Sequence, residues 1–393
     1  MKHGWEYKQI GDVCEVINGL WTGKKPPFVN VGVIRNTNFT KECTLDPSNI
    51  FYTDVEEKAY AKRKLQHGDI IIEKSGGSDK QPVGRPILFN LNGEFSFSNF
   101  TSVLRIKDAS IIADYLHMAL VGIYFQGKTR ALQSKTTGIH NLDFNKYLRL
   151  TIPVPPLPVQ QQICSLLDKL SRVIEAKKEQ LKELDNLAQA IFYDMFGDPV
   201  TNDKGWETST IDNISTEKLS YGSGASAVEY DGRTRYIRIT DINEIGDLNK
   251  DIKSPSEIDD KYLLKEGDLL FARSGATVGK TYCHNEKNGR CIYAGYLIKM
   301  RPNTLKVLPK YVFYYTKTDY YKAFVMNAQN SVAQPNINAK QYGALMITVP
   351  PLPLQQAFAE KVEAIERQKE LINQSIREVQ TLFDSRMDYW FSD

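Results

Sequence analysis

The sequence of 393 residues has no apolar run near the ~18 residues that a membrane-spanning helix needs. Its start, MKHGWEYKQIGDV, lacks the apolar region of a signal peptide. Cysteine is scarce, and five residues without a framework spacing predict reduced thiols. With 41% hydrophobic and 25% charged residues, the chain is predicted to be a soluble, cytoplasmic, globular protein without a membrane contact.

Groups of metal ligands are also missing. The single metal-like grouping is Cys283-His284 with Cys291, which flanks an Asn288-Gly289 turn. Chance residues on a hairpin explain it better than a zinc site does. We therefore predict no bound metal.

Catalytic motifs are missing as well. The segment SGATVGKT (274–281) resembles a nucleotide-binding loop, but only three residues separate Gly275 from Gly279, where the motif needs four. A β-like run, CIYAGYLIKM, follows where a phosphate-binding loop would open a helix. The chain also lacks a [DN]-P-P-[FYW] motif, a glycine-rich cofactor motif and a carboxylate–lysine nuclease cluster. We predict that it is not an enzyme and holds no cofactor.

What the chain does contain is an internal duplication. IPVPPLPVQQ (152–161) returns as ITVPPLPLQQ (347–356), 195 residues later. LQHGDIIIEKSGG (65–77) matches LKEGDLLFARSGA (264–276), VIRNTN matches YIRITD, and GWE occurs near the start of each copy. Repeats of this kind usually decide the architecture. The front part of each copy mixes β-type runs, glycine turns and short helical stretches, which predicts an α/β fold.

Four segments follow from the repeat and its proline runs. The proline runs suit the first turn of a helix and are interpreted as rigid hinges rather than as polyproline ligands. The predicted segments are a first α/β domain (1–151), a hinge with a long helix (152–198), a second α/β domain (199–346), and a second hinge with a long helix (347–393).

The rear part of each copy carries a heptad repeat over about five heptads, typical of a coiled-coil seam. Lys177 and Lys369 interrupt it at polar positions, which favours pairing of the two helices with each other. The heptad ends at Ile191 and Met195 in one copy and at Arg386 and Trp390 in the other. The predicted seam is Ile163, Leu167, Leu170, Ile174, Leu181, Leu184, Phe358, Val362, Ile365, Ile372, Ile376 and Val379.

Charge divides along the same boundaries. Counting Lys, Arg, Asp and Glu gives +5 for residues 1–158 and +3 for 199–354, but −2 for 159–198 and −3 for 355–393. The front domains are therefore the parts suited to a polyanion, through local patches.

Two polar segments in each front domain are candidates for DNA contact. One is the basic Ser-Gly loop after the buried strand, and the other is an amide-rich segment before the proline run, since Arg, Lys, Asn and Gln read base edges. An ordinary hairpin tip or an Asn-rich turn remains the alternative for each residue. Together with residues of the front domains outside these two segments, the candidates are Lys24, Arg35, Asn36, Lys74, Ser75, Gly76, Lys80, Arg85, Lys135, Thr136, His140, Asn141, Tyr221, Ser223, Arg238, Thr240, Asp241, Arg273, Ser274, Gly275, Thr277, Lys280, Gln334, Asn336 and Asn338.

Taken together, these motifs resemble the DNA-specificity subunits of type I restriction-modification systems over essentially the whole chain. The resemblance rests on the duplicated order of a GW start, an I-R-x-x-D-like strand, a G-D-[IL]-[IL] strand with a [KR]-S-G loop, and V-P-P-L-P-x-Q-Q. The first copy departs from it in having Asn38 in place of the acid and a longer loop.

The resemblance implies a non-catalytic subunit with two target-recognition domains, each of which reads half of a split site in double-stranded DNA. Two antiparallel helices would space the domains. Two methyltransferase subunits that use S-adenosylmethionine on adenine N6, and two restriction subunits that use ATP and Mg²⁺, would be the partners. The alternative is a coiled-coil scaffold with two domains that bind proteins or peptides.

Overall fold

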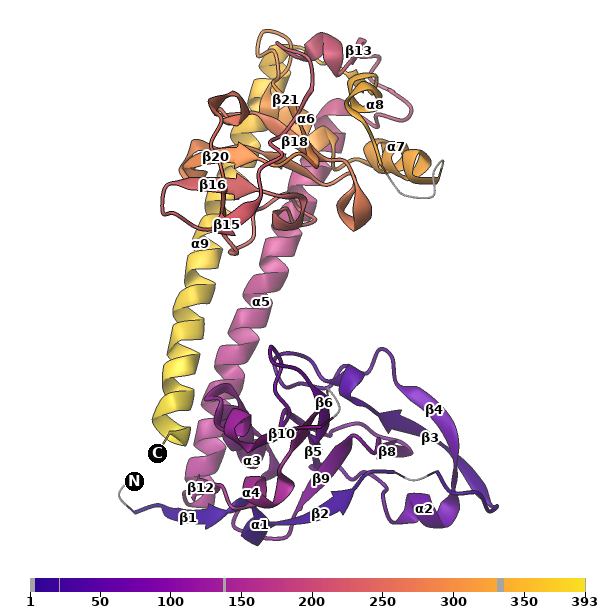
Figure 1. Ribbon diagram of the computed structural model, residues 1–393, viewed down its shortest axis with the longest axis vertical. Helices are drawn as coiled ribbons and strands as arrows, with labels where there is room; N and C mark the ends of the chain where they lie inside the picture. Colours follow the sequence, from indigo (N-terminus) through magenta and orange to yellow (C-terminus); the bar gives the residue numbers. More distant parts are fainter. Residues whose placement is uncertain (1–3, 21, 137–138, 331–335, 393) are drawn as a thin grey trace. The chain divides into compact units, whose positions relative to one another are not determined.

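The computed structural model describes residues 4–20, 22–136, 139–330 and 336–392 (Figure 1). The chain divides into two compact units, residues 1–176 with 375–393 and residues 177–374. Each unit contains the globular part of one repeat and a portion of both long helices. The units therefore differ from the sequence repeats, because the helices continue from one unit into the other.

Unit 1 contains a mixture of short strands and helices. The helices are α1 (Ile10–Val13), α2 (Glu57–Ala61), α3 (Ala113–Phe125) and α4 (Phe144–Leu148), with the 3-10 turns η1 (Asn36–Asn38) and η2 (Lys128–Leu132). The strands are β1 (Glu6–Gln9), β2 (Cys14–Asn18), β3 (Phe28–Ile34), β4 (Phe51–Glu56), β5 (Ile70–Glu73), β6 (Ser75–Gly77), β7 (Pro86–Leu88), β8 (Phe95–Phe97), β9 (Thr101–Ile106), β10 (Gln133–Thr136), β11 (Ile139–Leu142) and β12 (Thr151–Val154).

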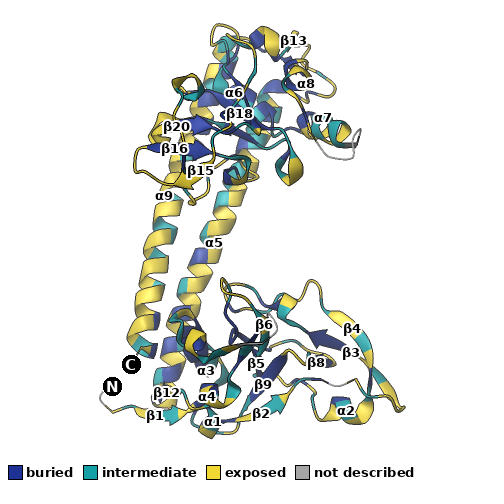
Figure 2. Cartoon of the chain, viewed as in Figure 1, coloured by how far each residue is buried: buried dark blue, intermediate teal, exposed yellow. Residues whose placement is uncertain are grey.

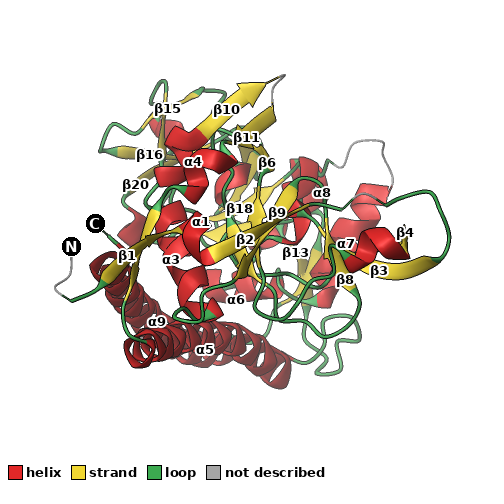
Figure 3. Cartoon of the chain, turned by 90° about the horizontal axis from the view of Figure 1, so that it is seen from below, coloured by secondary structure: helices red, strands yellow, loops and turns green. Residues whose placement is uncertain are grey.

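The centre of unit 1 is an antiparallel sheet in the order β2-β9-β5-β7, with β9 beside β2 (Figure 3). Both faces of this sheet are covered. Ile70 and Ile72 of β5 pack in one core with α3, whereas Ile71 packs in a second core with Phe97. Because successive side chains of a strand point to opposite faces, a continuous apolar run fits a strand buried on both sides. Smaller sheets, β4-β3-β8, β10-β11-β6 and β1-β12, surround it.

Unit 2 repeats this plan. Its helices are α6 (Pro309–Tyr315), α7 (Asp319–Asn330) and α8 (Ala339–Gly343), with the 3-10 turns η3 (Asp212–Ile214), η4 (Ile239–Asp241), η5 (Asp260–Tyr262), η6 (Gly275–Thr277) and η7 (Glu286–Asn288). Its strands are β13 (Thr208–Thr210), β14 (Ser220–Tyr221), β15 (Ala227–Glu229), β16 (Thr234–Ile237), β17 (Lys253–Pro255), β18 (Leu269–Ala272), β19 (Thr281–Cys283), β20 (Arg290–Tyr293), β21 (Leu297–Met300) and β22 (Met346–Thr348).

The sheet order in unit 2 confirms the duplication at the level of the fold. Its central sheet has the order β14-β21-β18-β19, the counterpart of β2-β9-β5-β7. The parallel pair β16–β20 corresponds to β3–β8, and β13–β22 corresponds to β1–β12. From the sequence, CIYAGYLIKM is predicted to be one β-like run. The structure corrects this, because a turn divides it into β20 and β21.

Two long helices, α5 (Leu157–Phe196) and α9 (Leu352–Phe391), follow the proline runs. In unit 1, Ile163 and Leu167 of α5 share a core with Met387 and Phe391 of α9. In unit 2, Ala188 and Phe192 of α5 share a core with Phe358, Val362 and Ile365 of α9. The start of each helix thus meets the end of the other, so they pack antiparallel. Figure 2 shows buried positions on both helices among many exposed ones. Six of the predicted seam residues are buried and the others are half-buried; the buried ones are Ile163, Leu167, Ile174, Phe358, Val362 and Ile365.

The buried stripe shifts by one residue at the end of each helix. Met387 and Phe391 are more buried than Arg386 and Trp390, because Phe391 packs on Tyr115 of α3, with ring centroids 5.3 Å apart. Likewise Phe192 and Phe196, rather than Ile191 and Met195, are buried against Tyr311 of α6. At these ends the helices pack on a globular domain as well as on each other.

A buried glutamine fixes the start of each long helix. In unit 1, Gln160 Nε2 donates to the carbonyls of Ser110 and Pro155 at 2.7 and 2.8 Å, and its Oε1 accepts from the N–H of Ile112 at 3.0 Å. Gln355 makes the equivalent three contacts in unit 2, and both glutamines are 0% exposed. The first Gln of each PPLP-x-QQ sequence therefore joins the helix to the domain.

Candidate nucleic-acid interface

The two polar segments singled out in the sequence lie side by side in unit 1. β6 pairs with β11, and Ser75 Oγ donates to Asn141 Oδ1 at 2.6 Å. The N–H of Leu142 donates to the carbonyl of Lys74 at 2.8 Å. Backbone pairing therefore brings a basic residue, a hydroxyl and an amide together on one edge.

Unit 2 brings together the corresponding residues. Ser274 and Asn336 form an antiparallel bridge, and the N–H of Ile337 donates to the carbonyl of Arg273 at 2.8 Å. Arg273 Nε donates to Asn336 Oδ1 at 3.2 Å, and the guanidinium lies 4.7 Å from the centre of the Tyr221 ring. The Tyr221 hydroxyl accepts from the N–H of Ala339 at 3.1 Å. The second site is thus built on the same backbone plan, with the same serine and asparagine and with Arg273 at the position of Lys74.

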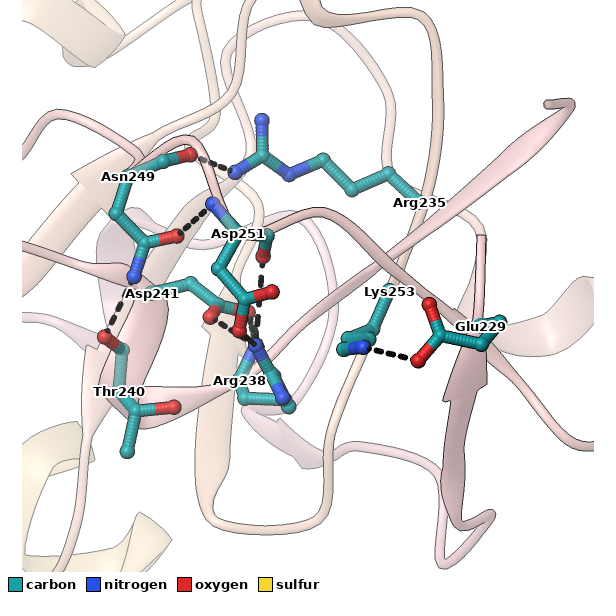
Figure 4. A network of polar contacts seen from close by, with 8 residues as sticks. All are labelled: Glu229, Arg235, Arg238, Thr240, Asp241, Asn249, Asp251 and Lys253. Carbon is teal, nitrogen blue, oxygen red and sulfur yellow. Dashed lines mark hydrogen bonds and ion pairs between the residues drawn. The ribbon is translucent and has the colours of Figure 1, made fainter. Parts of the chain in front are cut away.

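Arg238 in unit 2 is held between two carboxylates (Figure 4). Its Nη2 lies 2.6 Å from Asp241 Oδ1 and 3.0 Å from Asp251 Oδ2, and its Nε lies 3.0 Å from Asp241 Oδ2. Hydrogen bonding to Asp241 raises the pKa of Arg238 above its usual range. Asp241 is 1% exposed and also accepts from the N–H of Arg238, which closes the turn η4.

The same network holds the neighbouring loop in place (Figure 4). Asn249 Nδ2 donates to the carbonyl of Thr240 at 3.0 Å, and Arg235 Nη2 donates to the carbonyl of Asn249 at 2.6 Å. The Lys253 ammonium meets Glu229 at 2.6 Å. Much of the positive charge on this side of unit 2 is therefore already paired.

Arg35 is the counterpart of Arg238 in unit 1 and has a different environment. Asn38 replaces the acid, and its Oδ1 accepts from the N–H of Arg35 at 3.0 Å. The guanidinium lies 5.0 Å from the centre of the Phe51 ring, and its Nε has no hydrogen-bond partner in the described part of the chain. Asn36 Nδ2 donates to the carbonyl of Ser75 at 2.6 Å, so the Arg35 turn is joined directly to the Ser-Gly loop.

The loops themselves differ from a nucleotide-binding loop. After Arg273, residues Gly275–Thr277 form one 3-10 turn and the chain continues into strand β19, so no α-helix begins there. Gly76 and Gly275 have φ values of 104° and 68°, in the left-handed region that favours glycine. Thr277 Oγ1 donates to the carbonyl of Ser274 at 3.2 Å, within its own turn.

The lysines among the candidates differ in their exposure and in whether a carboxylate pairs with them. Lys24 and Lys80 are exposed. Lys74 is half-buried, and burial lowers its pKa. Lys280 Nζ is paired with Glu244 at 2.9 Å. Lys135 and Thr136 lie in β10, but their side chains are outside the described part of the structure, as is all of Gln334.

Several candidates have structural roles inside the fold. Arg85 is 4% exposed, its Nε pairs with Glu73 at 3.1 Å, and its Nη1 donates to the carbonyl of Phe39 at 2.8 Å. It is therefore not placed to meet a phosphate, contrary to its interpretation as a loop cation. Ser223 and His140 are also buried, with His140 Nε2 3.3 Å from Asp79, and Asn338 caps α8 by accepting from the N–H of Gln341.

Two exposed aromatic residues next to the candidate sites escaped the sequence analysis. The carbonyl of Phe100 accepts from the N–H groups of Lys74 and Ser75 at 2.9 and 3.0 Å, and the carbonyl of Tyr296 accepts from the N–H of Arg273 at 3.1 Å. Their side chains stay accessible, with 46% and 62% of the residue exposed. The available signal was their alignment at a spacing of 196 residues, one off the register of the proline runs.

Among the described residues, no group of three or more His, Cys, Asp or Glu side chains is arranged to hold a metal ion. Cys283 and Cys291, from the grouping noted in the sequence, are free thiols, and burial raises the pKa of Cys283 to about 12. Within the same part of the chain, every helix is too short or too polar to cross a membrane.

The model of the type I restriction modification DNA specificity domain matches this chain twice, at residues 2–186 and 203–381. The chain belongs to this family. The two matches coincide with the two copies of the repeat, so the DNA specificity domain occurs in tandem.

Curated relatives match nearly the full length. The chain is 23% identical to the type I restriction enzyme StySPI specificity subunit of Salmonella potsdam, over 98% of this chain and 87% of that protein. It is 24% identical to the EcoKI specificity subunit of Escherichia coli strain K12, over 93% and 82%.

Solved structures support the fold. A chain of a type I R-M system, solved to explain complex assembly and conformational transition, matches with a TM-score of 0.62 at 17% identity, covering 100% of this chain and 98% of that one. The type I restriction-modification S subunit of M. genitalium matches with a TM-score of 0.53 at 13% identity, with the same coverage.

Proposed function

We propose that this chain is the non-catalytic subunit that chooses the DNA site of a type I restriction-modification complex. Each globular domain reads one half of a bipartite site in double-stranded DNA, and the two long helices space the domains. The observation that carries this proposal is the repeated pairing of a basic Ser-Gly loop with an amide segment, Lys74-Ser75 with Asn141 and Arg273-Ser274 with Asn336.

Such an edge suits DNA recognition for a chemical reason. Basic groups and backbone N–H groups take phosphates, whereas amide and guanidinium groups read base edges. The backbone of the site is common to both copies, but some side chains differ. Lys74 of the first copy is equivalent to Arg273 of the second, and Asn38 is equivalent to Asp241. The two half-sites are therefore expected to differ in sequence.

The chemistry belongs to partner subunits in this proposal. Two methyltransferase subunits that bind S-adenosylmethionine dock on the helices and domains, and two restriction subunits that use ATP and Mg²⁺ complete the complex. The chain supplies no methyltransferase motif of its own. A methyltransferase flips its target base, so the specificity subunit must hold the duplex in register while this occurs.

The test is to co-express the chain with the methyltransferase subunit of its own system and to sequence the host DNA for N6-methyladenine. The expected result is a bipartite methylated motif. Exchanging residues 1–151 for those of a relative should change one half of the motif only. Asn336→Ala should relax the other half, whereas Gln161→Ala, an exposed position on α5, should change neither.

Absence of methylation despite a soluble complex would overturn the proposal. A soluble chain that binds no DNA at any salt concentration would point to a scaffold whose two domains bind proteins or peptides.

A further inference from the structure

A tight turn presents an aromatic ring at the same place in each repeat. In unit 1 the N–H of Thr101 donates to the carbonyl of Ser98 at 3.1 Å, which closes a turn with Phe100 at its third position. In unit 2 the N–H of Leu297 donates to the carbonyl of Ala294 at 2.8 Å, which closes the same turn around Tyr296. Each turn links a strand of the parallel pair to a strand of the central sheet.

Each turn is held rigidly from behind by a glycine. A Cβ atom added to Gly19 would lie 2.2 Å from the carbonyl oxygen of Ser98, and one added to Gly222 would lie 2.3 Å from that of Ala294. The residue after each glycine hydrogen-bonds to the strand before the turn, Leu20 to Phe97 at 3.0 Å and Ser223 to Tyr293 at 2.9 Å. Only glycine permits this close approach, so the position of the turn is fixed.

The turn is also tied to the candidate DNA-binding loop. In both units the carbonyl of the aromatic residue accepts from the backbone N–H of the basic residue in the Ser-Gly loop. This residue is Lys74 in unit 1 and Arg273 in unit 2. The ring itself remains exposed, and in the described part of the chain neither Phe100 nor Tyr296 packs on another aromatic ring. An exposed apolar ring thus stands beside groups suited to phosphates and base edges.

We propose that Phe100 and Tyr296 insert their rings at a base step of their own half-site and stack on the base exposed there. The inference rests on the proposed function and names two further DNA-contacting residues. Apolar side chains that enter a base step are an established way to open duplex DNA, and aromatic rings stack on any base. A ring held on a rigid turn loses little conformational freedom when it binds.

The comparison of the repeats explains why an aromatic residue is present in both. Stacking does not depend on which base is present, because every base has a π face. A stacking residue therefore suits both half-sites, whereas residues that read base edges must differ. Phe100 and Tyr296, at equivalent positions of the two repeats, are both aromatic. At neighbouring positions the repeats differ, with Lys74 equivalent to Arg273 and Asn38 equivalent to Asp241.

The experiment uses the complex with its methyltransferase subunit and a duplex that carries the methylated motif identified in the host. 2-Aminopurine replaces one base at a time through both half-sites, and its fluorescence reports local unstacking. Phe100→Leu should change the signal at one step of the first half-site only, and Tyr296→Leu at one step of the second only. Each variant should bind about tenfold more weakly, with unchanged salt dependence because the ring meets no phosphate.

Three further measurements keep the result interpretable. Phe100→Trp should restore the fluorescence and the affinity. Phe125→Leu, at a residue 61% exposed at the end of α3, should behave as wild type. Analytical size exclusion checks that each variant still forms the complex.

Leucine variants with wild-type fluorescence and affinity, while the methylated motif persists, would overturn the stacking role alone. A changed motif would also overturn it and make these residues base readers. If the wild-type complex methylated no motif at all, the proposed function itself would be wrong.

Discussion

Arg35 of the first repeat lies over the Phe51 ring, whereas its counterpart Arg238 is fixed by Asp241 and Asp251. The backbone around the two arginines is the same, since a residue at the third position of a 3-10 turn accepts from the arginine N–H in both. The difference comes from the carboxylates of Asp241 and Asp251, since Asn38 stands at the position of Asp241 in the first repeat. The arginine of unit 1 therefore has no carboxylate partner in the described part of the chain, whereas the arginine of unit 2 is paired with two.

One buried contact, in contrast, is the same in both repeats. Asp69 binds Arg105 through both carboxylate oxygens at 2.8 and 2.7 Å, and Asp268 binds Arg301 at 2.7 and 2.8 Å. Each of these aspartates also accepts from a backbone N–H three residues earlier. A buried polar group that loses its partner is costly, which explains why both repeats keep this pair.

The largest effect is expected at the buried glutamines, which test whether the two frames are equivalent. Gln160→Ala and Gln355→Ala each leave one N–H and two carbonyls without their partner. Each should lower the free energy of unfolding by about 3 kcal/mol, measured by urea denaturation. Gln161→Ala and Gln356→Ala, at exposed neighbours, should change it by less than about 0.5 kcal/mol.

If Gln355→Ala lowered the free energy of unfolding and Gln160→Ala did not, the two buried glutamines would contribute differently to stability. The comparison of the repeats would then fail for the interior as well as for the surface.

Much of this frame was predictable because repetition and periodicity are properties of the sequence. The spacing of the two VPPLP runs located both long helices, which begin at Leu157 and Leu352. Their heptads identified residues such as Leu167 and Val362, which are 0% exposed. A G-D followed by three or four apolar residues marked the central strands β5 and β18.

The candidate sites were less predictable, because they depend on pairing between distant segments. Arg85 looked like a loop cation, yet the fold uses it to neutralise the buried Glu73. Phe100 was not among the candidates, because the tight turn that exposes it depends on Gly19, far away in sequence. The stripe of α9 moved to Met387 and Phe391 because a globular domain packs there, which a two-helix heptad does not encode.

The next prediction concerns the two arginines and makes the surroundings of Arg35 resemble those of Arg238. Asn38→Asp places a carboxylate beside Arg35, as Asp241 lies beside Arg238. In the complex with the methyltransferase subunit, we expect about tenfold weaker binding of DNA and a salt slope smaller by about one, because one cation no longer meets a phosphate. Asn92→Asp, which adds the same charge at an exposed position of unit 1, is the control.

The reverse change should strengthen binding. Asp251→Asn removes one of the two carboxylates that pair with Arg238; the side chain of Asp251 is 63% exposed. Asp241 still caps its turn in this variant. Affinity should rise a few-fold, more than for Glu360→Gln on α9, an exposed position with the same change of charge. Equal gains in both variants would mean that Arg238 acts through net charge alone.

The smallest effect is a shared sensitivity to acid. Burial lowers the pKa of His117 in unit 1 and of His284 in unit 2 below the ordinary value of 6.5. Below pH 6.5 the unfolded chain then binds protons that the folded chain does not, so the free energy of unfolding falls as the pH falls. Because carboxyl groups ordinarily have pKa values of about 4, the range from pH 7.5 to 5.5 is the one in which to look for the effect of the histidines.

Replacing one histidine should remove its share of this slope. His284 is 2% exposed, and its Nδ1 lies 3.1 Å from the Tyr282 hydroxyl. His284→Gln should flatten the change in urea midpoint between pH 7.5 and 5.5, even if the protein is less stable at both. His67→Gln, at an exposed residue, should leave the slope unchanged. If His117→Gln flattened the slope and His284→Gln did not, acid would act on one repeat alone, and the two interiors would differ in their electrostatics.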